Sequence, residues 1–320
     1  MSLTNSGGGR RLPTVQEIDR AARIIREGGL VAFPTETVYG LGASALDEVA
    51  VARIFSAKGR PSTSPLIVHV ASAGEARALT AKWPSEASQL AARFWPGPLT
   101  LVLPKGKQIP DLVTAGLATV GVRIPSHPVA LELIRRAGVP IAAPSANPFT
   151  RLSPTEATHV TAALSSQVDL VLDAGPSPVG IESTVLSLAG ETPMLLRPGM
   201  VSRADIEALI GPVALAGEAT GAHPSPGMHR RHYAPRTRLR FVSGGRLPAE
   251  GRGAYLWIYC SAPAARGIQM PADPAGYAAR LYAVLHELDG EEWDWIAVER
   301  PPASPEWAAI LDRLTRAAEK

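Results

Sequence analysis

The chain alternates between stretches of helical and of strand-like hydrophobic spacing. After Thr14, apolar residues recur every three or four positions through Ile25, and Gly28-Gly29 follow, a pattern that predicts a helix with a Thr-x-x-Glu capping box. Residues 30–33 are a short apolar run typical of a buried strand. The alternation then predicts helices near residues 46–57, 128–136 and 203–210, and strands at 66–70, 99–103, 120–124, 140–143, 170–173, 184–188 and 194–197. This order indicates an α/β fold.

Two polar segments adjoin the predicted elements of this region. Residues 34–42 begin where the first strand ends, and loops at strand ends are where α/β proteins commonly place ligand chemistry. Residues 153–156 (SPTE) repeat the capping-box pattern, with proline at the first helical position. They predict that a helix begins there.

The periodic pattern weakens after residue 211 and resumes at residue 237. The segment between is rich in Gly, Ala, Pro and Ser and lacks periodicity, which is typical of a linker. After it, strands are predicted at 239–242, 254–259 and 295–298, and helices at 274–289 and 304–318. We therefore expect a first domain at 14–211, a linker at 212–236 and a small α/β domain at 237–320.

The composition narrows the class of protein. The chain has 320 residues, enough for two domains, and a formal net charge of only +3, which does not favour unspecific polyanion binding. Aromatic residues make up 5% of it, too few for a base-stacking nucleic-acid platform. A single cysteine, Cys260, excludes an intramolecular disulfide and a cysteine-based metal cluster. With no long apolar run and no signal-peptide pattern at residues 1–10, we expect a cytoplasmic protein without a membrane segment.

Two clusters suit the phosphate groups of a nucleotide. The sequence KGRP places Lys58 and Arg60 at alternate positions, so both point the same way in an extended segment. The sequence PSANP repeats that spacing with Ser145 and Asn147. Because no Gly-x-x-x-x-Gly-Lys-Ser/Thr motif is present, the clusters favour an ATP site outside the P-loop class. Taken alone, the first pair also fits a solvated surface and the second fits turn hydrogen bonds.

Two polar residues lie within otherwise apolar strands. Arg123 lies in the predicted strand 120–124, where a buried arginine is costly unless an acidic partner or a bound anion compensates it. His69 alternates with apolar neighbours, and a lone histidine in that position is more often a satisfied core residue than a ligand. The glycines at residues 40–45 (GLGASA) imitate a dinucleotide fingerprint. The lack of an acidic residue near position 60 argues against a nicotinamide site.

A series of short motifs runs along the chain in a fixed order. They are FPTETVYGLG (33–42), KGRP (58–61), PLIVH (65–69), WPGPLT (95–100), VRIP (122–125), PSAN (144–147), SPGM (225–228) and HYAP (232–235). In this order they resemble the threonylcarbamoyl-AMP synthases, and the last two resemble the linker of that family's long, two-domain form. The resemblance implies a YrdC-like twisted mixed sheet with flanking helices and a concave site, plus a smaller Rossmann-like α/β domain.

The resemblance also implies roles for individual residues. Positioning and charge neutralisation in catalysis would fall to Lys58, Arg60, Ser145 and Asn147. Further ATP contacts would come from Ser64, Thr119, Ser153, Arg197 and Tyr233. The threonine pocket would be formed by Thr37, His69, Arg123, Ala143 and Ser183, with the Arg123 guanidinium holding the carboxylate. The HRR sequence at 229–231 departs from the family pattern, which weakens the detailed role of those three positions.

The implied reaction joins L-threonine, bicarbonate and ATP into L-threonylcarbamoyl-AMP and releases pyrophosphate. Threonine would form a carbamate whose oxygen attacks the α-phosphorus, so no protein nucleophile is needed, and Mg²⁺ is expected on the nucleotide phosphates. The product is implied to pass to a separate transferase complex that modifies tRNA. Because the carbamate is short-lived in water, we expect the linker around 225–235 to close over the pocket.

Two other functions fit parts of the pattern. Between residues 219 and 248 there are six arginines and no acidic residue, which favours an RNA-binding or ribosome-maturation module with a weak tRNA contact. The low aromatic content and the absence of an RNA-binding signature argue against it. A carbamoyl-adenylate enzyme that uses carbamoyl phosphate would share the fold. Such proteins, however, are longer and carry zinc-finger cysteine pairs, which this chain lacks.

Overall fold

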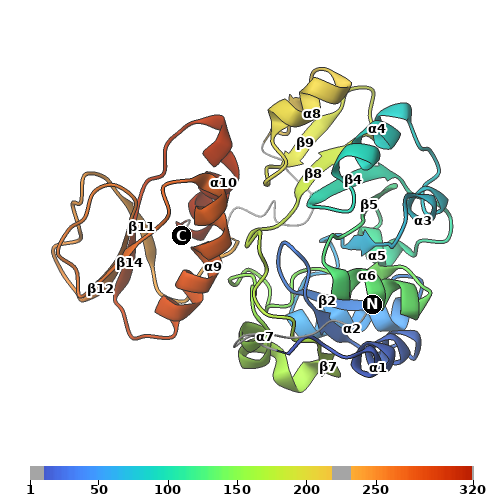
Figure 1. Cartoon of the computed structure of the whole chain (residues 1–320), viewed down its shortest axis with the longest axis horizontal. Coiled ribbons are helices and arrows are strands. Elements are labelled where there is room, and N and C mark those ends of the chain that lie inside the picture. The colour runs from blue at the N-terminus through green and yellow to red at the C-terminus, as the bar shows by residue number, and fades with distance from the viewer. Residues whose placement is uncertain (1–10, 218–231, 319–320) are drawn as a thin grey trace.

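The computed structural model describes residues 11–217 and 232–318, which fold into two α/β domains (Figure 1). The larger domain is built on a ten-stranded sheet that mixes parallel and antiparallel pairs, and the smaller on a four-stranded parallel sheet. The predicted fold class, a mixed α/β sheet followed by a smaller α/β domain, is confirmed. The helices of the smaller domain lie between its sheet and the larger domain.

The ten strands of the larger sheet lie in the order β10-β9-β8-β4-β5-β3-β6-β2-β1-β7. Their bounds are β1 (Val31–Phe33), β2 (Gly40–Ser44), β3 (Ile67–His69), β4 (Leu99–Pro104), β5 (Thr119–Arg123), β6 (Ile141–Ala142), β7 (Leu170–Val171), β8 (Thr184–Ser187), β9 (Met194–Arg197) and β10 (Ala214–Leu215). β3 runs parallel to β5 with His69 paired to Arg123. The two polar residues that stood out in apolar strands are therefore neighbours at the carboxyl ends of two central strands.

Eight helices are described in the larger domain. They are α1 (Val15–Arg26), α2 (Glu48–Lys58), α3 (Ala73–Ala78), α4 (Ser85–Phe94), α5 (Asp111–Thr114), α6 (Pro128–Ala137), α7 (Ala157–Leu164) and α8 (Arg203–Ile210). The capping box predicted at Thr14 is present. α2 ends at Gly59, whose φ of 58° is left-handed, a conformation that glycine adopts without steric cost. This turn carries the chain from Lys58 to Arg60.

Two local predictions were wrong. The helix expected to begin at residues 153–156 begins instead at Ala157, because the Ser153 hydroxyl donates to the Glu182 carboxylate rather than capping the helix. The glycines near residue 40, interpreted as part of a loop, lie in β2. A Cβ on Gly42 would come within 2.7 Å of the Phe33 ring, so glycine lets β2 pass close to β1.

The smaller domain packs directly against the larger one. Its strands lie in the order β11-β14-β12-β13, with bounds β11 (Leu239–Val242), β12 (Gly253–Trp257), β13 (Arg266–Gln269) and β14 (Trp295–Glu299). Its helices are α9 (Pro274–Asp289) and α10 (Ala308–Ala318). One apolar cluster joins Leu281 and Leu285 of α9 to Val38, Leu152 and Ile181 of the larger domain. This shared core fixes how the domains face each other.

The predicted linker is described only at its two ends. Its start contributes β10, which pairs with β9, and its end returns to the larger domain, where the Ala234 N–H donates to the Thr150 carbonyl at 3.0 Å. The SPGM motif at 225–228 and residues 229–231 lie outside the described residues. The boundaries at 211/212 and 236/237 stay predictions. None of the described helices has the length and hydrophobicity that crossing a bilayer requires.

Candidate active site

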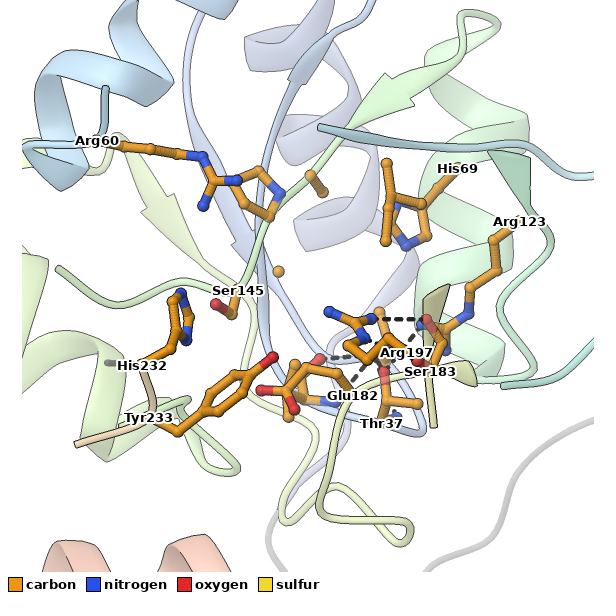
Figure 2. Close-up of a pocket in the computed structure, with 16 residues that line it drawn as sticks. Thr37, Arg60, His69, Arg123, Ser145, Glu182, Ser183, Arg197, His232 and Tyr233 are labelled. Carbon is orange, nitrogen blue, oxygen red and sulfur yellow. Dashed lines mark hydrogen bonds between the residues drawn. The ribbon is translucent and has the colours of Figure 1, made fainter. Parts of the chain in front are cut away.

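A small pocket lies where loops of the larger domain meet the end of the linker (Figure 2). Its free volume is about 50 Å³. It is lined by Thr35, Thr37, Val38, Gly40, Arg60, Ile67, His69, Arg123, Ala143, Pro144, Ser145, Glu182, Ser183, Arg197, His232 and Tyr233. Nine of the residues assigned by resemblance are in this set, although they span nearly two hundred positions of sequence.

The two predicted phosphate-binding clusters lie against each other. The Lys58 ammonium donates to the Ser145 carbonyl at 2.6 Å and also to the Asn147 carbonyl. In return, the Phe149 N–H donates to the Lys58 carbonyl at 2.8 Å. The loop after α2 and the loop after β6 are thereby joined into one structure.

Only part of this structure faces the pocket. Arg60 and Ser145 line it, whereas Lys58 and Asn147 are buried behind them. Burial, and secondarily the charge of Arg60, holds the pKa of Lys58 well below its usual value. Burial lowers the pKa of Arg60 to about 10, so its guanidinium is still charged at neutral pH. Of the two cations in this cluster, Arg60 is therefore the one that faces the pocket, where a ligand would bind.

The Arg123 guanidinium is held by three groups. Its Nη2 lies 2.6 Å from Glu36 Oε1, its Nη1 donates to the Thr37 hydroxyl at 3.0 Å, and its Nε donates to the Gly97 carbonyl at 3.1 Å. The Arg123 and Glu36 side chains are only 4% and 6% exposed. The sequence predicted an acidic partner or a bound anion for Arg123, and Glu36 is that acidic partner.

His69 faces the same part of the pocket as Arg123 (Figure 2). Burial and the nearby Arg123 charge lower the pKa of His69 to about 3, so the imidazole is neutral at neutral pH. Its ring meets that of Phe33 edge-on, with centroids 6.3 Å apart. A neutral imidazole beside a guanidinium and the Thr37 hydroxyl provides the polar, hydrogen-bonding surface that a small polar ligand requires.

Ser183 and Arg197 line the pocket next to Arg123 and Thr37 (Figure 2). Arg197 donates from Nε to the Ser183 carbonyl at 3.1 Å and from Nη2 to the Ser183 hydroxyl at 3.2 Å. The Ser183 hydroxyl lies 2.8 Å from that of Thr100 on β4. Both residues line the pocket, so a second guanidinium faces the one supplied by Arg60.

Besides Lys58, three residues predicted to contact ATP do not line the pocket. Ser64 is buried and receives a hydrogen bond from Arg60, which it helps to orient. Ser153 is buried and donates to Glu182. Thr119 begins β5, four residues or about 13 Å from Arg123 along the strand. Their nucleotide contacts stay predictions.

Tyr233 covers the pocket from the linker side. It is 1% exposed, and its φ of 60° is left-handed, which is unusual for tyrosine. Within the described residues, its hydroxyl has no hydrogen-bond partner. Neighbouring His232 also lines the pocket and meets the Phe149 ring edge-on at 5.8 Å. A strained tyrosine with an unpartnered hydroxyl is suited to receive a ligand.

Sequence reasoning assigned no role to two acidic residues, Glu182 in the pocket lining and Glu36 beside it, and overlooked one cation. Glu36 pairs with Arg123, and Glu182 pairs with Arg313 of α10 at 2.7 Å. A sequence signal for Arg313 exists, since it lies between Ile310 and Ala317 on the buried face of an amphipathic helix. A charge in that position requires a buried partner.

The described residues contain no group of three or more His, Cys, Asp or Glu that could hold a metal ion. The pocket's carboxylates are already paired with arginines. The donor set is therefore suited to anionic groups rather than to a metal bound by protein alone.

Two family models together match most of the chain. A model described as "Telomere recombination" (Sua5, YciO and YrdC) matches residues 23–199. A model described as "Threonylcarbamoyl-AMP synthase, C-terminal domain" matches residues 201–319.

Relatives and solved structures agree with these matches. The threonylcarbamoyl-AMP synthase of Bacillus subtilis is 43% identical, over 94% of this chain and 93% of its own length. That of Pyrococcus abyssi is 51% identical over 71% of this chain and 68% of its own length. A crystal structure of Pyrococcus abyssi Sua5 complexed with L-threonine has a TM-score of 0.89 and 40% identity. It covers 95% of this chain and 94% of that protein.

Proposed function

The chain belongs to the threonylcarbamoyl-AMP synthase family, and from this premise we propose that it makes L-threonylcarbamoyl-AMP from L-threonine, bicarbonate and ATP. The observation that carries the proposal is that one pocket is lined by two chemically distinct sets of side chains. Arg60, Arg197 and Ser145 suit a polyphosphate, while Arg123 and Thr37 suit an amino acid.

Threonine occupies the side with Arg123. A guanidinium binds both oxygens of a carboxylate, and neutral His69 with the Thr37 and Ser183 hydroxyls supplies hydrogen bonds for the amine and the side-chain hydroxyl. The Ala143 backbone completes this side. Because Arg123 is already paired with Glu36, threonine binding adds a second carboxylate to a buried cation.

The chemistry proceeds in two bond-forming steps. The neutral amine nitrogen of threonine attacks the bicarbonate carbon, and loss of one oxygen as water gives a carbamate. A carbamate oxygen then attacks the α-phosphorus, the bond to the β-phosphate oxygen breaks, and pyrophosphate leaves. Arg60, Arg197 and the Ser145 region position the phosphates and offset their charge, while Lys58 and Asn147 hold the loop that presents them. Cys260, the single cysteine, is exposed in the smaller domain, away from the pocket.

Mg²⁺ would come with the nucleotide, since the described residues offer no carboxylate cage for it. It would help the arginines to offset the charge of the phosphates.

The pocket must open to admit these substrates. Its free volume of about 50 Å³ is far below the several hundred Å³ of an ordinary ligand site. The cover formed by His232 and Tyr233 belongs to the linker, so we infer that this segment moves away for binding and returns to exclude water from the carbamate.

The product is passed to a tRNA-modifying transferase complex. The arginines described near the second end of the linker, Arg236, Arg238, Arg240 and Arg246, are exposed and offer a weak contact for tRNA phosphates.

Pyrophosphate release from ATP and Mg²⁺ tests the proposal. We expect release that requires both L-threonine and bicarbonate, and that falls about a hundredfold in Arg60→Met, because a phosphate cation of the pocket is lost. The matched control is Arg53→Met, which removes an arginine that pairs with Asp169 on the surface. It should leave the rate unchanged. Release that does not depend on threonine would refute the substrate assignment.

A further inference from the structure

A carboxylate lies in the wall of the pocket, close to the cations proposed to bind phosphate. Glu182 is 7% exposed and precedes Ser183, the residue that Arg197 holds through two hydrogen bonds. Burial alone would raise the pKa of Glu182, but the charges of Arg313 and then Arg197, with hydrogen bonds, lower it. The side chain is therefore charged at neutral pH.

Such a charge opposes the binding of a nucleotide unless another group compensates it. A free Glu182 carboxylate would repel a triphosphate, and it would also compete for the Arg197 guanidinium. Like charges that are desolvated together interact strongly because little water screens them. A counter-charge for Glu182 therefore favours the binding of an anionic nucleotide at this side of the pocket.

The smaller domain supplies that counter-charge. Arg313 of α10 has a fully buried side chain, and its Nε donates to Glu182 Oε2 at 2.7 Å. Its Nη2 donates to the Glu182 carbonyl at 3.3 Å, and the Tyr282 hydroxyl of α9 donates to Oε2 at 3.2 Å. On the remaining side of the guanidinium, Arg313 Nη1 donates to Asp312 Oδ2 at 2.7 Å. With Ser153 donating to Oε1, both carboxylate oxygens are engaged.

Arg313 also contacts the residue that covers the pocket. Its guanidinium carbon lies 5.1 Å from the centre of the Tyr233 ring, a cation–π geometry, and the Tyr233 and Tyr282 rings are 6.0 Å apart. Arg313 of the smaller domain therefore contacts both Glu182 in the pocket wall and Tyr233 in the pocket cover.

We propose that Arg313 is a positioning residue for the nucleotide side of the pocket. By neutralising and orienting Glu182 and by supporting Tyr233, it reduces the repulsion that an anionic nucleotide would meet at this side of the pocket. The smaller domain is thus part of the active site rather than an appended unit. The proposal rests on the proposed function for the identity of the nucleotide, ATP.

Arg313→Met tests this directly, because methionine keeps much of the volume and removes the charge. We expect the affinity for ATP, measured by calorimetric titration of the full chain, to fall about tenfold to a hundredfold, whereas threonine affinity changes less than about threefold. Arg313→Lys should restore part of the loss. Arg316→Met, which removes another arginine of α10 that pairs with Asp312, is the matched control and should bind ATP as the wild type does.

Two further variants keep the test informative if Arg313→Met does not fold. Tyr282→Phe removes one hydroxyl that donates to Glu182, and we expect ATP affinity to fall about threefold without a lower melting temperature. In the double variant Glu182→Gln with Arg313→Met, both charges are absent. Its ATP affinity should return to within about threefold of that of Glu182→Gln alone.

Two results would overturn the proposal. One is an equal loss of ATP and threonine affinity in Arg313→Met, and the other is additive losses in the double variant. Because ATP binding is measured without turnover, these outcomes are separate from the proposed function. A wild type that binds ATP but shows no threonine-dependent turnover would refute only the latter.

Discussion

Two buried arginine–glutamate pairs each contribute one residue to the lining of the same pocket, and they differ in how completely they are bonded. Arg123 and Glu36 both belong to the larger domain, whereas Arg313 and Glu182 join the two domains. The shortest distances are nearly equal, at 2.6 Å and 2.7 Å. Among the described residues, however, neither Glu36 oxygen has hydrogen-bond geometry with a donor, while both Glu182 oxygens accept hydrogen bonds.

The difference indicates which pair is prepared to change. A buried charge with unsatisfied hydrogen-bonding capacity is costly, so the Arg123–Glu36 pair gains from any ligand that supplies further bonds. The Arg313–Glu182 pair is already satisfied by Tyr282, Ser153 and its own guanidinium fork, and gains little from a ligand. The first pair is suited to bind substrate, and the second is suited to hold the pocket in shape.

The largest effect is expected from breaking the first pair. In Arg123→Met we expect the KM for threonine to rise about a hundredfold, since the charged hydrogen bonds to its carboxylate are lost. ATP affinity should change less than about threefold. Glu36 is also left unpaired, so the free energy of unfolding should fall by about 3–5 kcal/mol.

Steady-state kinetics with each substrate varied in turn measure this prediction, and thermal denaturation measures the loss of stability. Arg203→Met, which removes a surface arginine paired with Glu207, serves as the control. Equal increases in both KM values would contradict the assignment of Arg123 to the threonine carboxylate.

A smaller effect of opposite sign is expected from the other member of that pair. Glu36→Gln keeps the shape of the side chain and removes the charge that competes with a substrate carboxylate for Arg123. We expect threonine affinity to increase about three- to tenfold, measured by calorimetric titration at neutral pH. If affinity decreases instead, Glu36 pairs with the ammonium of threonine, and the pair complements both charges of the amino acid.

The contrast between the pairs also shows what the sequence could and could not predict. The position of Arg123 within an apolar strand indicated that it needed a partner. A buried charge must be compensated, and the apolar neighbours in the sequence show that Arg123 is buried. The identity of the partner, 87 positions earlier at Glu36, depends on how β5 and the loop after β1 meet in space. Tertiary contacts of that kind leave no periodic signal.

Local patterns failed where a tertiary contact was stronger than a local preference. Ser153 has the sequence of a helix cap, yet its hydroxyl bonds Glu182, and the helix begins at Ala157. The Lys58 ammonium joins two loops through the carbonyls of Ser145 and Asn147, and its contact with a phosphate stays a prediction. In both cases the bonding partner of the side chain is set by the fold.

The smallest effect concerns a second contact between the domains, the stacked rings of His159 and His286, whose centroids are 3.9 Å apart. His286 Nε2 also lies 3.0 Å from the Ser153 carbonyl. Burial, and then the neighbouring His159, lower the pKa of His286 to about 4 in the folded protein. The unfolded value is about 6.5, so below that pH the unfolded state binds a proton first and the folded state loses relative stability.

Between pH 7 and pH 5.5 this histidine should lower the free energy of unfolding by about 1 kcal/mol. His69, with a pKa of about 3, stays neutral beside Arg123 in the folded state over this range. It therefore destabilises the wild type and a His286→Gln variant equally. Denaturant unfolding at both pH values should therefore show a loss about 1 kcal/mol smaller in His286→Gln. Equal losses in the two proteins would mean that the folded domain contact accepts a proton at His286 without cost.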